Sequence, residues 1–560
     1  MDDGAGPTVR SAPRDAPAHP ADGTSVRRTG RRRVPALVWA LTALHVGLLL
    51  CFSLLYPPFT GFDEAQHVDA TLSLRYGEGW PGPDERVLSE ALVVVATPTL
   101  NGIAELPFSD DDPPPREQRP SLAATGVERP NTSYLVPNQI LQHPPLYYGL
   151  GAGVLAVVPG SDDWAYDRTV GVLRLLGVLL MSPLPLLAWA TARRLGAGTS
   201  TALAASALTL SVPQLQRVGA AVNNDSLYVL AFAAGVLVLV PVARGDVRRR
   251  TALVVGAVVG VALLSKGFAL ALVPATAVAY LVGRRRGEPD WWRNGLLALA
   301  VAFVVGGWWW LRNLIVFGTI QPDGSDAFRD ARLGRPRPEG SDVPVLAFLD
   351  GSYERLSSRF WGGLGINYQG PATFPALVTD LLVVASLAAV VVALVRLRRS
   401  RAGLAVGVLL PFAGTVAIVL VAVWGGYSYS LRFPGAQGRY LFGSLPGLAA
   451  GVALGLGVLV GLRLRRLLPL AVLLLAAVLQ GLGLWKVMAA AWMPPVGDRS
   501  RLDRFGTAVD ALVLWSPWPP LVTALMAAVP VLAGLAVLVL AARHALVRPG
   551  PLDDREPQPA

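Results

Sequence analysis

The chain has 560 residues, of which 53% are hydrophobic and only 16% charged, and its mean hydropathy is +0.47. A soluble protein of this length would carry far more charge, so composition excludes that class and predicts an all-α, polytopic bundle of about 12–13 transmembrane helices. The net charge of +11 lies in clusters beside apolar runs, which does not indicate nucleic-acid binding.

The first 33 residues are rich in Pro, Ala, Gly, Asp and Arg, and they predict a disordered cytoplasmic tail. The apolar run 34–56 that follows lacks a cleavage site, so we expect it to remain as an anchor. Eleven further spans are predicted at 168–192, 199–218, 225–242, 251–265, 267–282, 295–311, 376–395, 403–424, 440–462, 467–485 and 521–541.

One shorter apolar segment, 146–158, has only about thirteen residues, which is short for a span. It is either a re-entrant or interfacial helix, or a thirteenth crossing. If it crosses, then 251–282 must form one long tilted helix, and the turn at Arg193 changes sides.

Arginine clusters predict the orientation, because cytoplasmic loops carry an excess of Lys and Arg. The clusters lie at 27–33, 193–194, 248–250, 284–286, 396–399, 463–466 and 543–548. They place both termini in the cytoplasm and make the chain a multi-pass protein of the cytoplasmic membrane. The two long polar loops, 57–143 and 313–375, are then extracytoplasmic, as is the shorter loop 486–520.

Two adjacent acids, Asp63 and Glu64, lie about one turn beyond the first apolar run. Their structural interpretation is a capping box, with Asp63 at the N-cap and Gln66 three residues later. The functional interpretation adds His67, which would share a helix face with Asp63. Such a cluster at the membrane boundary could deprotonate an acceptor hydroxyl or hold a divalent cation.

A second polar position is His143, in the run Gln142-His143-Pro144-Pro145-Leu146-Tyr147-Tyr148. The prolines give a helix a rigid start, and tyrosines are typical of the headgroup level. His143 has no such structural explanation. We expect its imidazole to lie near the outer surface, where the first long loop returns to the membrane.

An Asp-Glu pair just after the first span, followed by a long outer loop that ends in His-Pro-Pro-Leu-Tyr-Tyr, resembles the pattern of the GT-C superfamily. These are the integral-membrane glycosyltransferases that use polyprenyl-phosphate sugars. The superfamily includes the protein O-mannosyltransferases and the aminoarabinose transferases, and the nearest pattern is that of a bacterial subgroup. Further matching motifs are Arg174-Leu175-Leu176-Gly177, Asn223-Asn224-Asp225, Trp308–Trp310 with Leu311-Arg312-Asn313, Phe360-Trp361-Gly362-Gly363 and Gln437-Gly438-Arg439-Tyr440-Leu441. The resemblance covers roughly residues 34–462 and depends on the order of these motifs rather than on any one of them.

The resemblance implies that Asp63 is the catalytic carboxylate and that Glu64, the second acid of the family, orients or assists it. No further acidic motif is recognisable, and the remaining acids to consider are Asp69, Asp84 and Asp110. The implied organisation is a GT-C-like catalytic module at 34–462, C-terminal transmembrane helices at 463–547 and a disordered tail at 548–560.

A lipid-phosphate leaving group requires nearby cations, because negative charge develops on it in the transition state. The candidates are Lys266, Arg312, Arg432 and Arg439. Lys266 interrupts an apolar stretch, which favours a functional role, although a lysine can also snorkel to the headgroups. Arg312 and Arg439 stand at outer helix boundaries, where contact with a lipid headgroup is the alternative.

Two other motif positions have structural alternatives as well. Trp361 could stack on a sugar ring or serve as an interfacial anchor. The residues Asn223, Asn224 and Asp225 are interpreted as a cap of the helix that follows them.

The predicted function is transfer of a sugar from a polyprenyl-phosphate donor to an acceptor on the extracytoplasmic face, in the cell envelope. The expected partners are this lipid-linked sugar, membrane lipid and an acceptor glycan, lipid or protein, with no nucleic acid. No cofactor is required, although a divalent cation is compatible with the acidic cluster.

Two alternatives belong to other functional classes. A transporter or flippase of an envelope precursor predicts internal repeats and ionisable residues within several spans, whereas the sequence shows no repeat and suggests few buried charges. A non-catalytic scaffold with the same fold is the second alternative, and the presence of Asp63 argues against it.

Overall fold

The structure is a computed structural model that describes residues 34–76, 79–80, 87–96, 106–110, 113–122, 138–284, 289–322, 333–366, 374–497 and 499–546. The chain divides into a unit that ends at Pro35 and a unit that begins at Ala36. Every helix described below belongs to the second unit. The two predicted disordered tails, 1–33 and 548–560, lie outside the described residues.

Helices make up the secondary structure of the described residues, apart from an isolated β-bridge between Ser121 and Ala165. The first half contains α1 (Ala36–Leu55), α2 (Glu64–Arg75), α3 (Glu90–Ala96), α4 (Leu146–Val157), α5 (Tyr166–Met181), α6 (Leu184–Leu195), α7 (Thr199–Leu208), α8 (Pro213–Gly219), α9 (Asp225–Ala243), α10 (Arg249–Leu263) and α11 (Leu272–Gly283). The second half contains α12 (Trp291–Ala302), α13 (Trp308–Phe317), α15 (Val345–Gly362), α16 (Ala376–Arg396), α17 (Arg398–Ala402), α18 (Leu410–Ser430), α19 (Leu445–Leu459), α20 (Gly461–Leu464), α21 (Leu468–Ala491), α22 (Arg501–Trp515) and α23 (Pro520–Leu546). The predicted all-α class is confirmed.

Nine of the twelve predicted spans coincide with helices of the described chain that are long and apolar enough to cross a membrane. They are Ala36–Leu55, Tyr166–Leu195, Asp225–Ala243, Trp291–Phe317, Ala376–Arg396, Arg398–Ser430, Gly438–Leu459, Gly461–Ala491 and Pro520–Leu546. Several of these combine consecutive helices, such as α5 with α6. A multi-pass membrane protein follows from this set.

The other three predicted spans, 199–218, 251–265 and 267–282, consist of shorter helices. The first is divided into α7 and α8, and α8 begins at Pro213, whose ring is tolerated only in the first turn of a helix. The other two are separated at Lys266, which has the extended backbone angles φ −163° and ψ 151°. The alternative of one long helix across 251–282 is therefore wrong.

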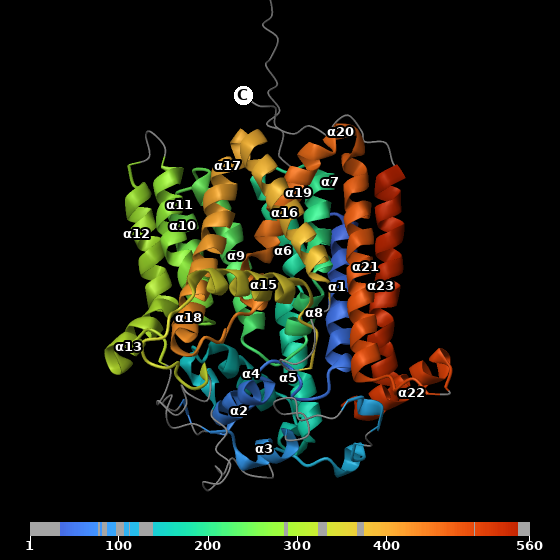
Figure 1. The fold of residues 1–560 in the computed structure, drawn as a ribbon. Coiled ribbons are helices and arrows are strands. Elements are labelled where there is room, and N and C mark those ends of the chain that lie inside the picture. Colours follow the sequence, from blue (N-terminus) through green and yellow to red (C-terminus); the bar gives the residue numbers. More distant parts are fainter. Residues whose placement is uncertain are drawn as a thin grey trace, which may run out of the picture. The chain divides into compact units, whose positions relative to one another are not determined.

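The ambiguous apolar segment forms α4, a helix of 12 residues. At 1.5 Å per residue it is about 18 Å long, well short of the roughly 30 Å of a hydrocarbon core. It packs against α2, and Figure 1 shows it near α2 and α3, at one end of the bundle. These features favour the re-entrant or interfacial interpretation.

Two of the nine helices are more buried than the others. Within their most apolar stretches, 72% of Asp225–Ala243 and 78% of Gly438–Leu459 are buried, against 17% of α23. Asp225 is the first residue of α9, and Arg439 lies in the 3-10 turn that leads into α19. The two most buried of these helices thus carry charged residues of the site described below.

Gly438 allows the chain to approach α15 closely just before Arg439. A Cβ atom at this position would lie 2.3 Å from the backbone nitrogen of Phe360. Only glycine fits so near another backbone. The Gln437-Gly438-Arg439 motif is therefore held against the last turns of α15.

Candidate active site

The turn between α1 and α2 has an unusual backbone. Phe59 and Asp63 both adopt positive φ angles, of 67° and 53°, which are uncommon for residues other than glycine. Asp63 occupies the N-cap position of α2, but its side chain makes no capping hydrogen bond. The predicted capping box with Gln66 is therefore wrong, and the carboxylate of Asp63 is directed elsewhere.

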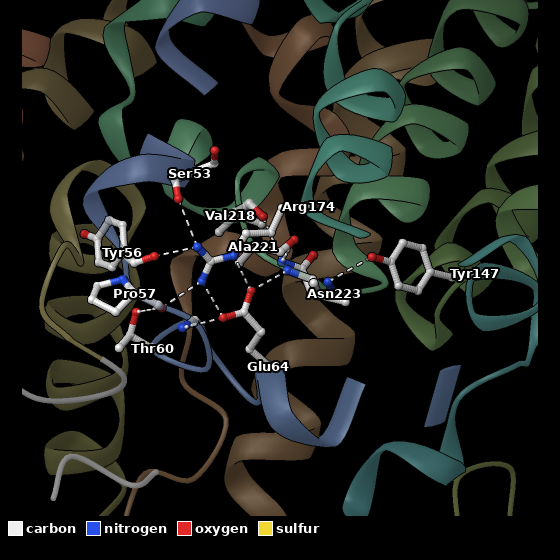
Figure 2. Close-up of polar contacts among 12 residues, drawn as sticks. Ser53, Tyr56, Pro57, Thr60, Glu64, Tyr147, Arg174, Val218, Ala221 and Asn223 are labelled. Atoms are coloured by element: carbon white, nitrogen blue, oxygen red, sulfur yellow. Dashed lines mark hydrogen bonds and ion pairs between the residues drawn. The ribbon is translucent and has the colours of Figure 1, made fainter. Parts of the chain in front are cut away.

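A buried ion pair between Glu64 and Arg174 holds this turn in place (Figure 2). Arg174 Nε and Nη2 donate to the two carboxylate oxygens of Glu64 at 2.8 and 2.6 Å. Arg174 also donates to the carbonyl oxygens of Ser53, Tyr56 and Pro57, at the end of α1. The arginine thus ties α1, the turn and α2 to α5.

Glu64 accepts two further hydrogen bonds from backbone amides. The amide of Val222 lies 2.9 Å from Oε1, and the amide of Gly61 lies 3.3 Å from Oε2. Buried carboxylates are stable in proteins only when their oxygens are paired in this way. Glu64 is thus fixed by these contacts, directly beside Asp63 in the sequence.

The carboxylate of Asp63 lies between two side chains from distant parts of the chain. Gln139 Nε2 donates to Oδ1 at 2.9 Å, and Arg439 Nη2 lies 3.5 Å from Oδ2. The side chain of Asp63 is 14% exposed, whereas that of Arg439 is 4% exposed. Asp63 therefore faces a polar cluster and still retains some accessible surface.

Arg439 also belongs to a second, deeper ion-pair network. Its Nε lies 3.6 Å from Oδ2 of Asp225, and Lys266 Nζ lies 2.7 Å from Oδ1 of the same carboxylate. All three side chains are almost fully buried. Lys266 is thus an internal ion-pair partner, which excludes the alternative of a lysine that snorkels to the headgroups.

The sequence interpretation of Asp225 as part of a helix cap missed its main contact. Asn224 occupies the N-cap of α9 and makes no side-chain capping bond, although Asn223 Oδ1 accepts from the amide of Ser226. Asp225 instead pairs with Lys266. The sequence did contain a signal for this ion pair, because Asp225 and Lys266 are both charged residues beside long apolar runs.

Phe62, the residue before Asp63, helps to hold Arg439. The guanidinium carbon of Arg439 lies 4.2 Å from the centre of the Phe62 ring, and that of Arg217 lies 3.8 Å from it. Cation–π contacts of this kind favour a fixed guanidinium orientation. The turn therefore positions the cation as well as the carboxylate.

His67 and His143 lie close to the same cations. His67 Nδ1 is 3.0 Å from the hydroxyl of Tyr148. Within the described residues, Nδ1 of His143 is buried and has no hydrogen-bond partner. Burial, and then the charge of Lys266, hold the pKa of each histidine well below its usual value of 6.5. Both imidazoles are therefore neutral at pH 7.

This neutrality predicts a loss of stability in mild acid. The unfolded chain protonates its histidines near pH 6.5 and the folded chain only at lower pH, so the unfolded state binds more protons as the pH falls. Below about pH 6.5 the free energy of unfolding should decrease, by up to about 1.4 kcal/mol per pH unit for each histidine. The unfolding temperature of the purified protein between about pH 7.5 and 5.5 measures this effect. The His67→Gln/His143→Gln variant should show a flatter profile, and an unchanged slope would contradict the assignment.

Two predicted site residues are not brought to this cluster by any contact of the described chain. The guanidinium of Arg312 contacts Asn313, Trp309 and Phe317, all on its own helix α13. Trp361 packs edge-on against Phe360 at the end of α15, with its indole nitrogen buried. Phe360 lies against Gly438, so the Trp361 ring is near the turn that carries Arg439. Arg312 is exposed.

The remaining acids differ in their surroundings. Asp69 accepts hydrogen bonds from Asn138 Nδ2 at 2.8 Å and from the amide of Ser89 at 3.2 Å, which closes part of the first long loop. Asp110 is exposed, and Asp84 lies outside the described residues. In the described part of the chain, no group of three or more His, Cys, Asp or Glu side chains could hold a metal ion.

Buried charges are more numerous than the sequence suggested. The pairs Glu64–Arg174, Asp225–Lys266 and Arg119–Asp167 are all nearly inaccessible to solvent. The expectation of few buried charges, which counted against a transporter, is therefore wrong.

Part of the chain matches a known family of membrane glycosyltransferases. Residues 142–310 match the model of the dolichyl-phosphate-mannose-protein mannosyltransferase family. The match includes His143, Arg174, Asp225 and Lys266, and it confirms the predicted GT-C-type membrane glycosyltransferase at the level of the superfamily. No curated protein matches the chain.

Solved structures give a weaker likeness. ArnT from Cupriavidus metallidurans, bound to undecaprenyl phosphate, is 16% identical with a TM-score of 0.39, over 89% of this chain and 78% of ArnT. The archaeal oligosaccharyltransferase AglB from Archaeoglobus fulgidus, in complex with an inhibitory peptide and a dolichol-phosphate, is 14% identical with a TM-score of 0.40. That alignment covers 92% of this chain and 56% of AglB. At these TM-scores the likeness carries no further argument.

Proposed function

We propose that this protein transfers a sugar from a polyprenyl-phosphate donor to an acceptor hydroxyl, and that Asp63 is the catalytic base. One observation carries the proposal: a partly exposed aspartate lies beside a buried network of two cations, Arg439 and Lys266. The matched family is named for a donor of the same class, a sugar linked to a polyprenyl phosphate.

The reaction is a single displacement at the anomeric carbon. Asp63 accepts the proton of the acceptor hydroxyl as its oxygen forms a bond to that carbon. The bond between the carbon and the phosphate oxygen breaks, and the polyprenyl phosphate leaves with the electron pair. The donor bond is already activated, so the step requires no ATP.

Arg439 and Lys266 are the groups that stabilise the departing phosphate. The contacts of Arg439 to Asp63 and Asp225, at 3.5 and 3.6 Å, are longer than the roughly 2.7–2.9 Å of a well-formed charge-assisted hydrogen bond. An arriving phosphate could therefore compete for this guanidinium. Lys266 is held tightly by Asp225 and contributes mainly through its charge.

The neutral histidines complete the site as hydrogen-bonding groups. His143 Nδ1 is available to a sugar hydroxyl, since within the described residues it has no other partner. His67 is linked to Tyr148 and so borders the same region. We assign both to substrate binding, and Trp361 to the neighbouring surface, where its ring could contact the acceptor or the sugar.

The proposed site lies on the extracytoplasmic side. Figure 1 shows α2 and α3 at one end of the bundle and α17 and α20 at the other. The arginine-rich segments 396–399 and 463–466 overlap α17 and α20. Because such clusters favour the cytoplasm, the end that carries Asp63 is assigned to the outside, and the N- and C-terminal tails to the cytoplasm.

The proposal is tested with the full-length protein in vesicles that contain a radiolabelled polyprenyl-phosphate hexose and a membrane extract as acceptor. Label should leave the polyprenyl-phosphate fraction and enter a new product only when the protein is present. Intact donor that appears on the opposite leaflet would instead support a flippase. A label that stays in the donor, on its original side, with every hexose tried would contradict the proposed transfer.

A further inference from the structure

The connection between α9 and α10 borders a cavity of about 780 Å³. Four arginines line it, namely Arg194, Arg244, Arg248 and Arg250, and Asp246 is the one acidic residue of the lining. Binding pockets for small molecules generally occupy roughly 300–1,000 Å³. The cavity is thus large enough for a ligand and carries an excess of positive charge.

This cavity lies far from the Asp63 cluster. Asp225, at the cluster, is the first residue of α9, and the cavity begins near the last residues of the same 19-residue helix. At 1.5 Å per residue α9 is about 28 Å long, close to the thickness of a hydrocarbon core. The cavity is therefore at the opposite membrane boundary and forms no part of the proposed active site.

The lining is polar at one end and apolar along one wall. Val238 and Pro241 of α9 and Val254 of α10 supply the apolar part. Val254 is 52% exposed, on a helix with a strongly apolar sequence. An exposed valine one turn inside the membrane boundary would contact lipid, so the cavity is open toward the acyl chains as well as toward the arginines.

The lining of the cavity contains four arginines and one acid. Arg248 pairs with Asp246 at 2.7 Å. Arg194 donates to the backbone carbonyl of Leu237, and Arg244 to that of Arg194. Arg250 has no hydrogen-bond or ion-pair partner among the described residues. A phosphate group in this cavity would lie close to several arginine N–H donors.

We propose that the cavity binds the phosphate headgroup of an anionic membrane phospholipid, with part of an acyl chain along the wall formed by Val238 and Val254. Arginines recognise phosphate through paired N–H donors. Basic pockets between transmembrane helices are suited to anionic lipid headgroups. The apolar wall, continuous with the bilayer, favours a lipid over a soluble phosphate.

Three consecutive arginines provide a matched test. Arg248 and Arg250 line the cavity, whereas Arg249 between them does not. Arg284 is also outside the lining, although Gly283 beside it packs against Val242 at the end of α9. The Arg248→Gln/Arg250→Gln variant therefore removes two charges from the cavity, and Arg249→Gln/Arg284→Gln removes two charges near it.

Native mass spectrometry of the full-length protein in detergent, titrated with dioleoyl phosphatidylglycerol or dioleoyl phosphatidylcholine, measures the binding. We expect the wild type to prefer phosphatidylglycerol, and each lining arginine lost to weaken binding about fivefold. The cavity variant should thus bind about 25-fold more weakly, whereas the control variant should stay within roughly twofold of the wild type.

Three results would overturn the proposal. Equal binding of the two lipids would remove the role of headgroup charge. An equal loss of phosphatidylglycerol binding in the cavity variant and the control variant would indicate that the lipid is attracted by the general surface charge and not by a specific site. Inorganic phosphate that stabilises the wild type, but not the cavity variant, without any binding of phosphatidylglycerol would identify a soluble phosphate as the ligand.

Discussion

Asp63→Asn is expected to lower the rate of sugar transfer by roughly 10²–10⁴-fold, the usual contribution of a general base. The amide has the size of the carboxylate but cannot accept the acceptor proton. Asparagine also tolerates the left-handed backbone of this position, at φ 53°. The substitution therefore changes the chemistry with little effect on the turn, and the initial rate of label transfer in reconstituted vesicles measures the loss.

Asp162→Asn is the matched control for this experiment. Asp162 lies in the same region and pairs with Arg75 at 2.9 Å, but its side chain is 55% exposed. Exposed ion pairs contribute little to stability, so transfer should remain close to the wild-type rate. A normal rate in Asp63→Asn, with normal membrane insertion, would rule out Asp63 as the base.

Arg174→Met is expected to destabilise the folded protein by about 3–5 kcal/mol, because it leaves the carboxylate of Glu64 buried and unpaired. The methionine removes both bonds to Glu64 and the three bonds to the carbonyl oxygens of Ser53, Tyr56 and Pro57. A lower unfolding temperature and a lower yield of purified protein should both be observed.

The double variant Arg174→Met/Glu64→Gln separates the lost ion pair from the other effects. It buries no unpaired charge, so its unfolding temperature should exceed that expected from the sum of the two single variants. Strictly additive losses would show that the two side chains are not coupled. The single variant Glu64→Gln also tests roles: if it abolished transfer without changing the unfolding temperature, Glu64 would replace Asp63 as the proton acceptor.

The helical fold was predictable because its signals are local. The length of each apolar run and the arginines beside it predict a span and its direction. The break at Lys266 was predicted as well, because the spans 251–265 and 267–282 lie on either side of it, and the structure has an extended backbone there. The contact of Lys266 with Asp225 was not predicted. Propensity alone does not reveal such a tertiary contact.

The contacts within the site were much less predictable. Glu64 and Arg174 are 110 residues apart, and Asp225 and Lys266 are 41 residues apart. Residue spacing carries no information on pairings over such distances. The motif order did indicate Asp63 and Arg439, which the structure places 3.5 Å apart, but it indicated Arg312 equally, and that residue lies on an exposed face of α13.

The capping interpretation of Asp63 failed for a related reason. The pattern Asp-x-x-Gln is typical of a helix start whose cap residue has an extended backbone. Here the ion pair of Glu64 with Arg174 fixes the turn, and Asp63 adopts a left-handed conformation instead. Strained backbone of this kind is frequent at functional sites, and it directs the carboxylate toward Arg439.

The most direct measurement is a cryo-electron microscopy structure of the full-length protein in nanodiscs with bound polyprenyl phosphate. The account predicts phosphate density in contact with Arg439, next to Lys266, with the carboxylate of Asp63 facing the same space. Phosphate bound instead at Arg312, or anywhere that Asp63 cannot reach, would contradict it.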